Sequence, residues 1–423
     1  MTDYRQRIVD SLLKRKLKSK GAVLIEGPKW CGKTTTAEQS ALSTIVLDEP
    51  TRFKDNMLMA EISPDLILDG PVPRLIDEWQ IAPKLWDAIR HRVDHTDGYG
   101  QFILTGSSVP ANLSEVIHSG TGRFAWIRMR PMTLFESGDS TGQVSLKDLF
   151  DSKDVSGMSE MSIERLAFLT CRGGWPETVG MDDEIALDPS IDYVEGVMRN
   201  DINRVDGKEK DYQKVRALMR SYARNQGMQT SFSTISSDIS VNETSRVSDE
   251  TVSSYVSALK KLFVIEDLPA WNPNLRSKTA IRTSDTRYFV DPSIATASLG
   301  AGPGDLIKDT NTFGFILETL VIRDLRTYAQ VLDGEVYRYH DSLDNECDAV
   351  IHLRNGRYAL IEIKLGGESL VSEGVKSLKS VLKRLDTDKM GKPSFMAVIT
   401  GIGGFSYRQE DGIYVIPIGC LRP

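Results

Sequence analysis

The chain has 423 residues, which corresponds to about three domains at roughly 150 residues each. Hydrophobic residues make up 40% of the chain, enough for packed cores, so a disordered or fibrous protein is excluded. The net charge of -7 excludes a protein that coats nucleic acid with a basic surface throughout, although a local basic face remains open.

No apolar run approaches the roughly 20 residues that span a bilayer, and the polar N-terminus lacks the apolar core of a signal peptide. We therefore expect a cytoplasmic protein with no membrane contact. The cysteines have no CxxC spacing, which argues against a disulfide framework and against a zinc site. We expect all four to be packing residues: Cys31, Cys171, Cys347 and Cys420.

Residues 1–137 alternate short apolar runs with polar helical stretches, which predicts an α/β domain with a parallel sheet covered by helices. Three runs have the character of buried strands, at residues 22–26, 73–76 and 101–104. Each leads directly into a turn with polar residues. Because ligands bind at the carboxyl ends of the strands in such sheets, we expect the chemistry in these three turns.

The first turn, Gly27-Pro-Lys-Trp-Cys-Gly-Lys-Thr34, fits the phosphate-loop pattern GxxxxGK[ST] at every fixed position. The glycines let backbone N–H groups surround the phosphates of ATP, while Lys33 would reach the β and γ phosphates and Thr34 would bind Mg²⁺. A chance match in a turn is the alternative, and the strand before the turn and the helical sequence after it argue against that. The residues expected to contact the nucleotide are Gly27, Pro28, Lys29, Trp30, Cys31, Gly32, Lys33, Thr34 and Thr35.

An acidic pair, Asp77 and Glu78, follows the second strand, 44 residues after Lys33. We expect Asp77 to hold the Mg²⁺ shell and Glu78 to orient or activate the attacking water. Alone, such a pair is often only a solvated turn. Together with the phosphate loop, the two carboxylates predict hydrolysis of ATP rather than binding alone.

The third strand ends in Thr105-Gly-Ser-Ser108, where a small polar side chain can lie beside the γ phosphate, although this is also ordinary turn chemistry. Further along, Arg123 lies in the Gly-rich turn Gly120-Thr-Gly-Arg123. This arginine is a candidate for stabilising transition-state charge, in cis or in trans. A surface arginine in a loop is an equally good interpretation of the same turn.

Five motifs in order resemble a family of prokaryotic AAA-type ATP-binding proteins in which a C-terminal domain of unknown function follows the ATPase. They are the phosphate loop, Leu75-Ile-Asp-Glu-Trp-Gln80, Phe102-Ile-Leu-Thr-Gly-Ser-Ser108, Gly122-Arg123 followed by Met129-Arg-Pro-Met-Thr-Leu-Phe-Glu136, and Arg172-Gly-Gly-Trp-Pro-Glu177. The resemblance covers nearly the whole chain. It implies an AAA-type P-loop NTPase domain that binds Mg-ATP at residues 27–34, with Asp77 and Glu78 as the Mg²⁺ and water residues.

A central module is expected between residues 206 and 304, after a helical extension at residues 138–205. The start of that extension, residues 138–160, is rich in Ser, Gly and Asp, which indicates an exposed connection.

The central module is locally basic. Within residues 208–290, 13 Lys or Arg against 9 Asp or Glu give a local charge of +4. Helices that end with residues 249–263, followed by strands at 264–268 and 287–290, are typical of a winged helix. The helix at 249–263 could bind nucleic acid, and a protein interaction is nearly as well supported.

The last segment, residues 305–423, combines a helix around Glu318 with several strand-like runs, two of which form a hairpin through Asn355-Gly356. Glu362 and Lys364 fall on one face of the second hairpin strand, and Asp348 lies on the first. Two carboxylates and an ammonium group at one place suit metal-assisted phosphodiester cleavage, with Asp348 and Glu362 as Mg²⁺ ligands and Glu318 as a further one. The alternative is a cross-strand ion pair on a solvated face.

The string Asn345-Glu-Cys-Asp348 with Ala359-Leu-Ile-Glu-Ile-Lys364 resembles the PD-(D/E)xK nuclease superfamily. This resemblance implies a restriction-endonuclease-like α/β domain with Asp348, Glu362 and Lys364 in catalytic roles. We therefore expect an ATPase that regulates engagement or cleavage of DNA or RNA by its C-terminal domain. The alternative is a nucleotide-dependent switch that binds a protein partner or a second copy of itself, with an inactive nuclease-like fold.

Overall fold

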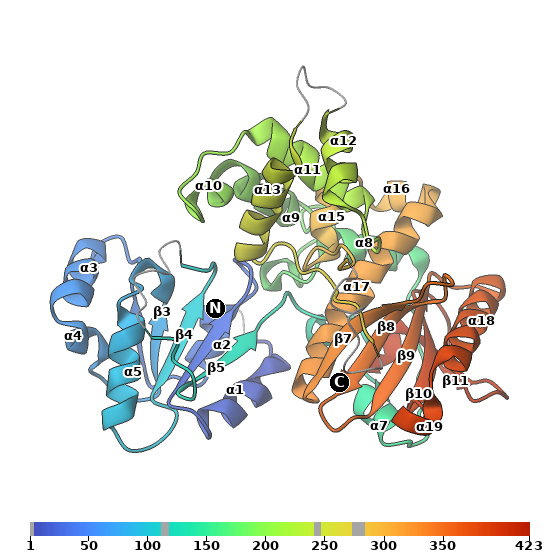
Figure 1. Ribbon diagram of the computed structural model, residues 1–423, viewed down its shortest axis with the longest axis horizontal. Helices are drawn as coiled ribbons and strands as arrows, with labels where there is room; N and C mark the ends of the chain where they lie inside the picture. The colour runs from blue at the N-terminus through green and yellow to red at the C-terminus, as the bar shows by residue number, and fades with distance from the viewer. Residues whose placement is uncertain (1–3, 111–117, 241–246, 273–283) are drawn as a thin grey trace. The chain divides into compact units, whose positions relative to one another are not determined.

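The computed structural model describes residues 4–110, 118–240, 247–272 and 284–423 (Figure 1). Contacts within the chain divide it into two compact units. The first unit consists of residues 1–131, 200–209 and 258–263, and the second of residues 132–199, 210–257 and 264–423. In the described ranges, no helix is long and apolar enough to cross a bilayer.

The first unit contains a five-stranded parallel sheet with the strand order β2-β3-β4-β1-β5 (Figure 1). Its strands are Ala22–Glu26 (β1), Ser43–Val46 (β2), Arg74–Asp77 (β3), Phe102–Gly106 (β4) and Phe124–Arg128 (β5). The three predicted strands are confirmed as β1, β3 and β4, the last two beginning one residue later than predicted. Strands β2 and β5 were not predicted; β2 is only partly buried, and β5 leaves Trp126 47% exposed.

Helices cover both faces of this sheet. Leu24 of β1 packs with Trp86 and Ile89 of α5 in one apolar cluster, while its neighbour Ile25 is buried on the opposite face. Helices α1 and α2 contact β1. The helices are Val9–Leu17 (α1), Lys33–Glu38 (α2), Phe53–Ile62 (α3), Pro64–Leu68 (α4) and Leu85–His95 (α5). The arrangement is the predicted parallel sheet between helical layers.

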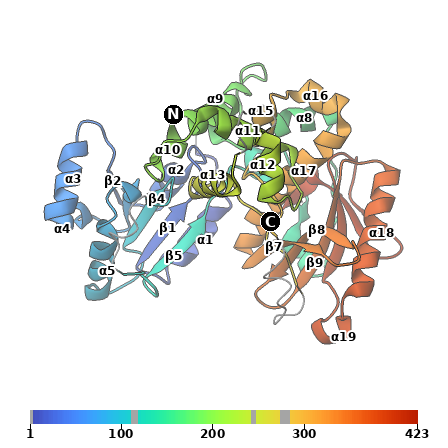
Figure 2. The same cartoon turned by 45° about the horizontal axis from the view of Figure 1, so that its top comes forward.

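The second unit contains a six-stranded sheet with the order β11-β12-β10-β9-β8-β7. Its strands are Gly334–His340 (β7), Glu346–Leu353 (β8), Tyr358–Lys364 (β9), Phe395–Thr400 (β10), Tyr407–Arg408 (β11) and Tyr414–Pro417 (β12). The antiparallel register of β8 and β9, with Ala349 opposite Ile361, confirms the predicted hairpin. Helices Thr310–Val331 (α17) and Glu368–Arg384 (α18) pack on this sheet from opposite sides (Figure 2).

The prediction of an exposed connection at residues 138–160 is wrong in its central part. Strand Val144–Ser145 (β6) pairs with Leu421–Arg422 (β13), and helix Leu146–Phe150 (α7) buries Leu149 and Phe150. The serine that made the segment look loop-like caps this helix, because the Ser145 hydroxyl accepts the backbone N–H of Asp148 at 3.2 Å. Ser145 therefore serves as a helix cap, whereas residues 151–154 are exposed as predicted.

Further helices of the described residues belong to the second unit, except for residues 200–209 and 258–263, which belong to the first. They are Leu134–Ser137 (α6), Ile163–Arg172 (α8), Asp188–Gly196 (α9), Ile202–Arg204 (α10), Tyr212–Arg224 (α11), Phe232–Ser240 (α12), Asp249–Lys261 (α13), Pro292–Leu299 (α15), Pro303–Lys308 (α16) and Thr387–Met390 (α19). A π-helical stretch, Val197–Asp201, connects α9 to α10. After α13, the two predicted strands pair only through isolated antiparallel bridges, Ile265 with Phe289 and Leu268 with Thr286. The order of elements agrees with the winged-helix outline, which stays a prediction.

Candidate nucleotide site and C-terminal charge cluster

The predicted phosphate loop connects the end of β1 to the start of α2. Gly27 passes so close to the chain after β5 that an added Cβ would lie 2.0 Å from the Met129 carbonyl oxygen. Gly32 has a φ of 94°, a left-handed conformation that favours glycine. The structure therefore explains why glycine is required at both fixed glycine positions of the pattern.

Two side chains that follow Gly32 point back toward the loop. Lys33 is buried and its ammonium group donates to the Pro28 carbonyl oxygen at 2.8 Å, across the loop. The Thr34 hydroxyl donates to Asp77 Oδ1 at 2.9 Å, and Thr105 at the end of β4 donates to the same oxygen. The ends of β1, β3 and β4 thus meet at one place, as predicted.

A hydroxyl and a carboxylate are oxygen ligands of the kind that Mg²⁺ prefers, and the metal also takes water and substrate phosphates as ligands. Thr34 and Asp77 therefore fit the Mg²⁺ role expected of them. The contact with Thr105, to the same oxygen, further fixes the Asp77 carboxylate.

Glu78 is held in an unusual conformation beside this pair. Its backbone is left-handed, with φ of 56°, which is uncommon for a residue other than glycine and occurs at functional sites. The Ser107 hydroxyl donates to Glu78 Oε2 at 3.0 Å, and the Gln80 side-chain amide donates to the same oxygen. The turn after β4 therefore orients the predicted water-activating carboxylate.

Arg7, which precedes α1, also contacts the loop and was missed by the sequence prediction. Its guanidinium group is buried and donates to the Cys31 carbonyl oxygen at 2.6 Å and to the Arg130 carbonyl oxygen at 2.8 Å. It thereby connects the phosphate loop to the chain that follows β5. No pattern near Arg7 indicates this contact, because its partners lie 24 and 123 residues away.

Arg7→Ala should weaken ATP binding. Hydrogen bonds to charged groups contribute roughly 1.5–3 kcal/mol each. Losing both bonds should leave the loop less ordered, so we expect the Kd for ATP to rise about tenfold, equivalent to about 1.4 kcal/mol. Isothermal titration with ATP and Mg²⁺ measures this, with the exposed neighbour Arg5→Ala as the matched control. Equal affinity in the two variants would show that Arg7 does not support the loop.

Arg123 lies at the other end of the sheet from the phosphate loop. Its carbonyl oxygen accepts the N–H of Ala22, the first residue of β1, and its side chain pairs with Asp94 at 2.6 Å. The five residues of β1 separate this position from the loop by about 16 Å at roughly 3.3 Å per residue. The geometry does not support a role for Arg123 in cis, and the role in trans stays a prediction.

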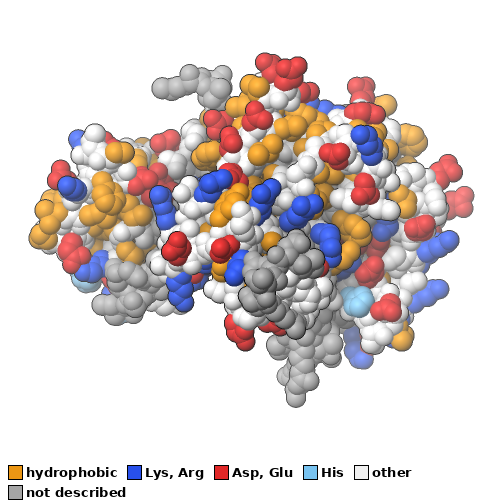
Figure 3. All heavy atoms as spheres, turned by 90° about the horizontal axis from the view of Figure 1, so that it is seen from above, with side chains coloured by type: hydrophobic (Ala, Val, Ile, Leu, Met, Phe, Trp, Pro, Cys, Tyr) orange, Lys and Arg blue, Asp and Glu red, His pale blue; other side chains and the backbone are white. Residues whose placement is uncertain are grey.

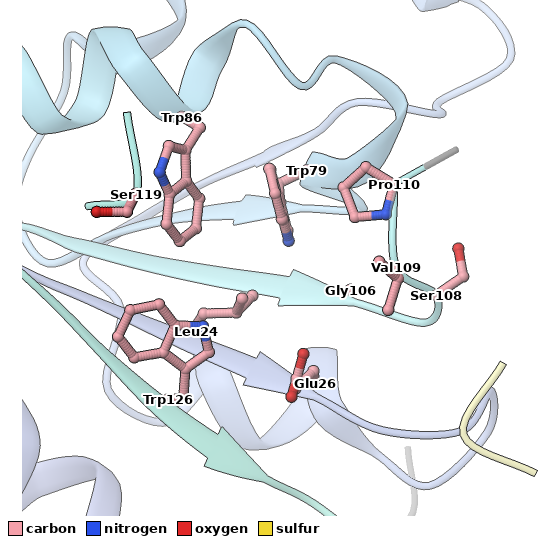
Figure 4. Close-up of a pocket in the computed structure, with 10 residues that line it drawn as sticks. All are labelled: Leu24, Glu26, Trp79, Trp86, Gly106, Ser108, Val109, Pro110, Ser119 and Trp126. Carbon is pink, nitrogen blue, oxygen red and sulfur yellow. The ribbon is translucent and has the colours of Figure 1, made fainter. Parts of the chain in front are cut away.

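A pocket of about 260 Å³ lies beside the nucleotide site, on the face of the sheet where Trp79, Trp86 and Trp126 lie (Figure 4). Glu26, Leu24 and Gly106 also line it. None of residues 27–35 does, so this pocket is distinct from the phosphate loop.

The second unit brings together the four C-terminal residues singled out from the sequence. Lys364 Nζ lies 2.8 Å from Glu362 Oε2 and 3.7 Å from Asp348 Oδ2. Glu318 of α17 is buried next to Asp348, as the predicted further carboxylate. The three carboxylates are at most 9% exposed, so the solvated-face interpretation is wrong.

Burial dominates the electrostatics of this cluster. Burial, reinforced by repulsion from Asp348, raises the pKa of Glu318 and that of Glu362 to about 8. Burial lowers the pKa of Lys364, but the carboxylates of Asp348 and Glu362 outweigh it and raise this pKa overall. The lysine therefore stays charged beside Glu318 and Glu362, whose carboxyl groups resist ionisation.

Arg338 of β7 is the cluster residue that the sequence prediction missed. Its guanidinium group lies 3.1 Å from Glu318 Oε1, 2.8 Å from Glu346 Oε2 and 3.9 Å from Asp348 Oδ1. Within the described residues, no three His, Cys, Asp or Glu side chains are arranged to hold a metal ion. The carboxylates expected to bind Mg²⁺ have positively charged side chains as partners instead.

Three family profiles match successive parts of the chain. Residues 19–137 match an AAA domain, residues 163–305 match a domain of unknown function (DUF8612), and residues 313–421 match another (DUF4143). The last match agrees with the resemblance to ATPases that carry such a C-terminal domain. A search of curated proteins gave no match.

Two solved structures are similar in part. A Walker-type ATPase of Pyrococcus abyssi is 14% identical, with a TM-score of 0.44, covering 70% of this chain and 96% of its own. A DNA polymerase III gamma subunit-related protein from Thermotoga maritima is 11% identical, with a TM-score of 0.21, covering 70% of this chain and 99% of its own. Both TM-scores are below 0.5, and no conclusion depends on them. The AAA-domain match and the sheet with its phosphate loop identify residues 19–137 as a P-loop ATPase domain of the AAA type.

Proposed function

We propose that this protein hydrolyses ATP with Mg²⁺ and that the nucleotide cycle regulates its engagement of nucleic acid. The observation that carries the ATPase part is the convergence of Thr34, Asp77, Glu78 and Ser107 beside the phosphate loop. A chance loop match would not bring the ends of three strands together in this way.

Each side chain has a defined task in this proposal. Lys33 would bind and neutralise the phosphates, while Thr34 and Asp77 would hold Mg²⁺, which would supply positive charge to the transferred phosphoryl group. Glu78 orients the attacking water and accepts its proton, and Ser107 and Gln80 keep its carboxylate in place. A protein that only binds nucleotide would not need the Glu78 carboxylate held in place by two donors.

The regulatory part is supported by two later segments that belong to the first unit. Residues 200–209 contact the phosphate loop, where Lys29 Nζ lies 2.7 Å from Asp201 Oδ1. Residues 258–263 contact the turn after β4, where Val109 N–H donates to the Lys261 carbonyl oxygen at 3.1 Å. The Arg128 guanidinium group also lies 4.1 Å from the centre of the Phe263 ring. The helix α13, a candidate for binding nucleic acid or a protein partner, thus has its last residue, Lys261, in contact with Val109 in the turn that also carries Ser107.

Asp201→Asn should tighten ATP binding, because Lys29 is then released to interact with the phosphates. The pair is partly exposed, so we expect about a 2–5-fold lower Kd, consistent with the roughly 0.2–1 kcal/mol of such pairs. In a Lys29→Met background the same change should have no effect, and titration of all four proteins with ATP measures this coupling. The exposed Asp192→Asn is the control. An equal effect with and without Lys29 would disprove the coupling.

Nucleic acid should stimulate ATP hydrolysis, and the stimulation should fall as salt is added because phosphate contacts release counterions. On the face shown in Figure 3, Lys and Arg side chains lie among acidic and apolar ones. Phosphate release with DNA or RNA at several salt concentrations measures this. Stimulation by neither nucleic acid would favour the switch that binds a protein partner.

A further inference from the structure

The C-terminal cluster combines three buried carboxylates with two buried or half-buried cations, and the nuclease resemblance implies a divalent metal there. Asp348 Oδ2 and both oxygens of Glu362 are engaged by the chain itself. Asp348 Oδ2 accepts the backbone N–H of Ile363 at 2.8 Å and lies near Lys364. Glu362 accepts the Ser377 hydroxyl at 2.9 Å on one oxygen and Lys364 at 2.8 Å on the other. These residues do not fit a metal site as they are arranged.

Arg338 is fixed at this position by its main chain as well as its side chain. Its backbone N–H donates to the Pro269 carbonyl oxygen at 2.9 Å, and its carbonyl oxygen accepts the Trp271 N–H at 2.7 Å. The residue is only 8% exposed. A guanidinium group stays protonated in proteins, so this charge is permanent. Its partners Glu318 and Glu346 bind it from two sides at 3.1 and 2.8 Å.

We propose that Arg338 is the permanent cation of this cluster and that the C-terminal domain works without a divalent metal at Asp348 and Glu362. A divalent ion bound to Asp348 would lie close to the guanidinium group, because Asp348 Oδ1 is 3.9 Å from Arg338. Like charges at such a separation in a buried site repel strongly. The domain therefore engages nucleic acid without metal-dependent cleavage at this cluster, which narrows the proposed function and does not depend on ATP hydrolysis.

The test is a titration of the full chain with Mn²⁺, without nucleotide, in an Asp77→Asn background that disables the other expected metal site. We expect no Asp348-dependent binding of Mn²⁺ with a Kd below about 1 mM, because protein sites for divalent cations have Kd values of roughly 1 mM or lower. One Mn²⁺ bound more tightly than this, and lost on adding Asp348→Asn, would overturn the proposal. Because Asp77 is already changed, the result is independent of whether the chain is an ATPase.

A second variant tests the proposal by an expected gain of metal binding. Arg338→Met in the same background should create a site for one Mn²⁺ that Asp348→Asn removes, with the exposed Arg354→Met as the matched control. If Arg338→Met folds, as circular dichroism would show, and still binds no Mn²⁺, then Arg338 is not what excludes the metal, and the proposal fails. If it does not fold, the titration of the parent protein decides alone.

Cleavage gives an independent readout. DNA and RNA, single- and double-stranded, should stay intact with the wild-type chain in Mg²⁺ or Mn²⁺. Cleavage that disappears in Asp348→Ala and in Lys364→Ala would contradict the proposal directly.

Discussion

Glu78→Gln is expected to bind ATP as the wild type does but to turn it over at least about 100-fold more slowly, since a positioned general base contributes roughly 10²–10⁴-fold. Glutamine keeps the shape of the side chain and can still accept hydrogen bonds from Ser107 and Gln80, but it cannot accept a proton from water. Steady-state phosphate release gives the rate, and titration with ATP gives the affinity.

The control for this variant is Glu38→Gln, which changes an exposed glutamate at the end of α2 and should leave the rate unchanged. Lys33→Ala, in contrast, should lose binding as well as turnover, because it removes the ammonium group from the loop. Wild-type turnover in Glu78→Gln would mean that another group activates the water.

Arg323→Leu should destabilise the second unit by about 3–5 kcal/mol, the usual effect of removing one partner from a buried charge pair. Arg323 lies 2.8 Å from both Asp291 and Asp324, and all three side chains are at most 2% exposed. Asp291 also accepts the backbone N–H of Gly174, and Asp324 that of Leu134. Leucine would leave two buried carboxylates without a counter-charge and weaken the connections between four segments.

Urea unfolding followed by tryptophan fluorescence measures this effect, because Trp175 is fully buried and donates to Ser293 beside the same network. Arg224→Leu removes an arginine that is 67% exposed and pairs with Asp238, and it should cost less than about 1 kcal/mol. Similar unfolding midpoints for the two variants would show that the buried pairs contribute no more than a surface pair does.

Much of the nucleotide site could be predicted from the sequence, because its residues occur in short local patterns. The phosphate loop, Asp77 and Glu78 each directly follow an apolar strand, and the carboxyl ends of parallel strands meet at one edge. A local pattern also predicted the hairpin that brings Asp348 and Glu362 together, because the turn at Asn355-Gly356 fixes the register of its two strands.

The supporting residues could not be predicted, because their partners are distant in the sequence. Arg7 contacts Arg130 across 123 residues, and Arg338 contacts Glu318 across 20 residues from a neighbouring element. The position of Arg123 could not be predicted for a related reason. A Gly-rich turn after a strand does not reveal at which end of the sheet it lies, and here it precedes β5 rather than following it.

The central claim is that residues 27–35, with Asp77 and Glu78, form a site that hydrolyses Mg-ATP. The most direct test is phosphate release from ATP by the purified full chain, with Mg²⁺ or with EDTA, for the wild type and Lys33→Ala. We expect release that requires Mg²⁺ and is abolished in Lys33→Ala. Equal release by the two proteins, or no release by the wild type under any of these conditions, would contradict it.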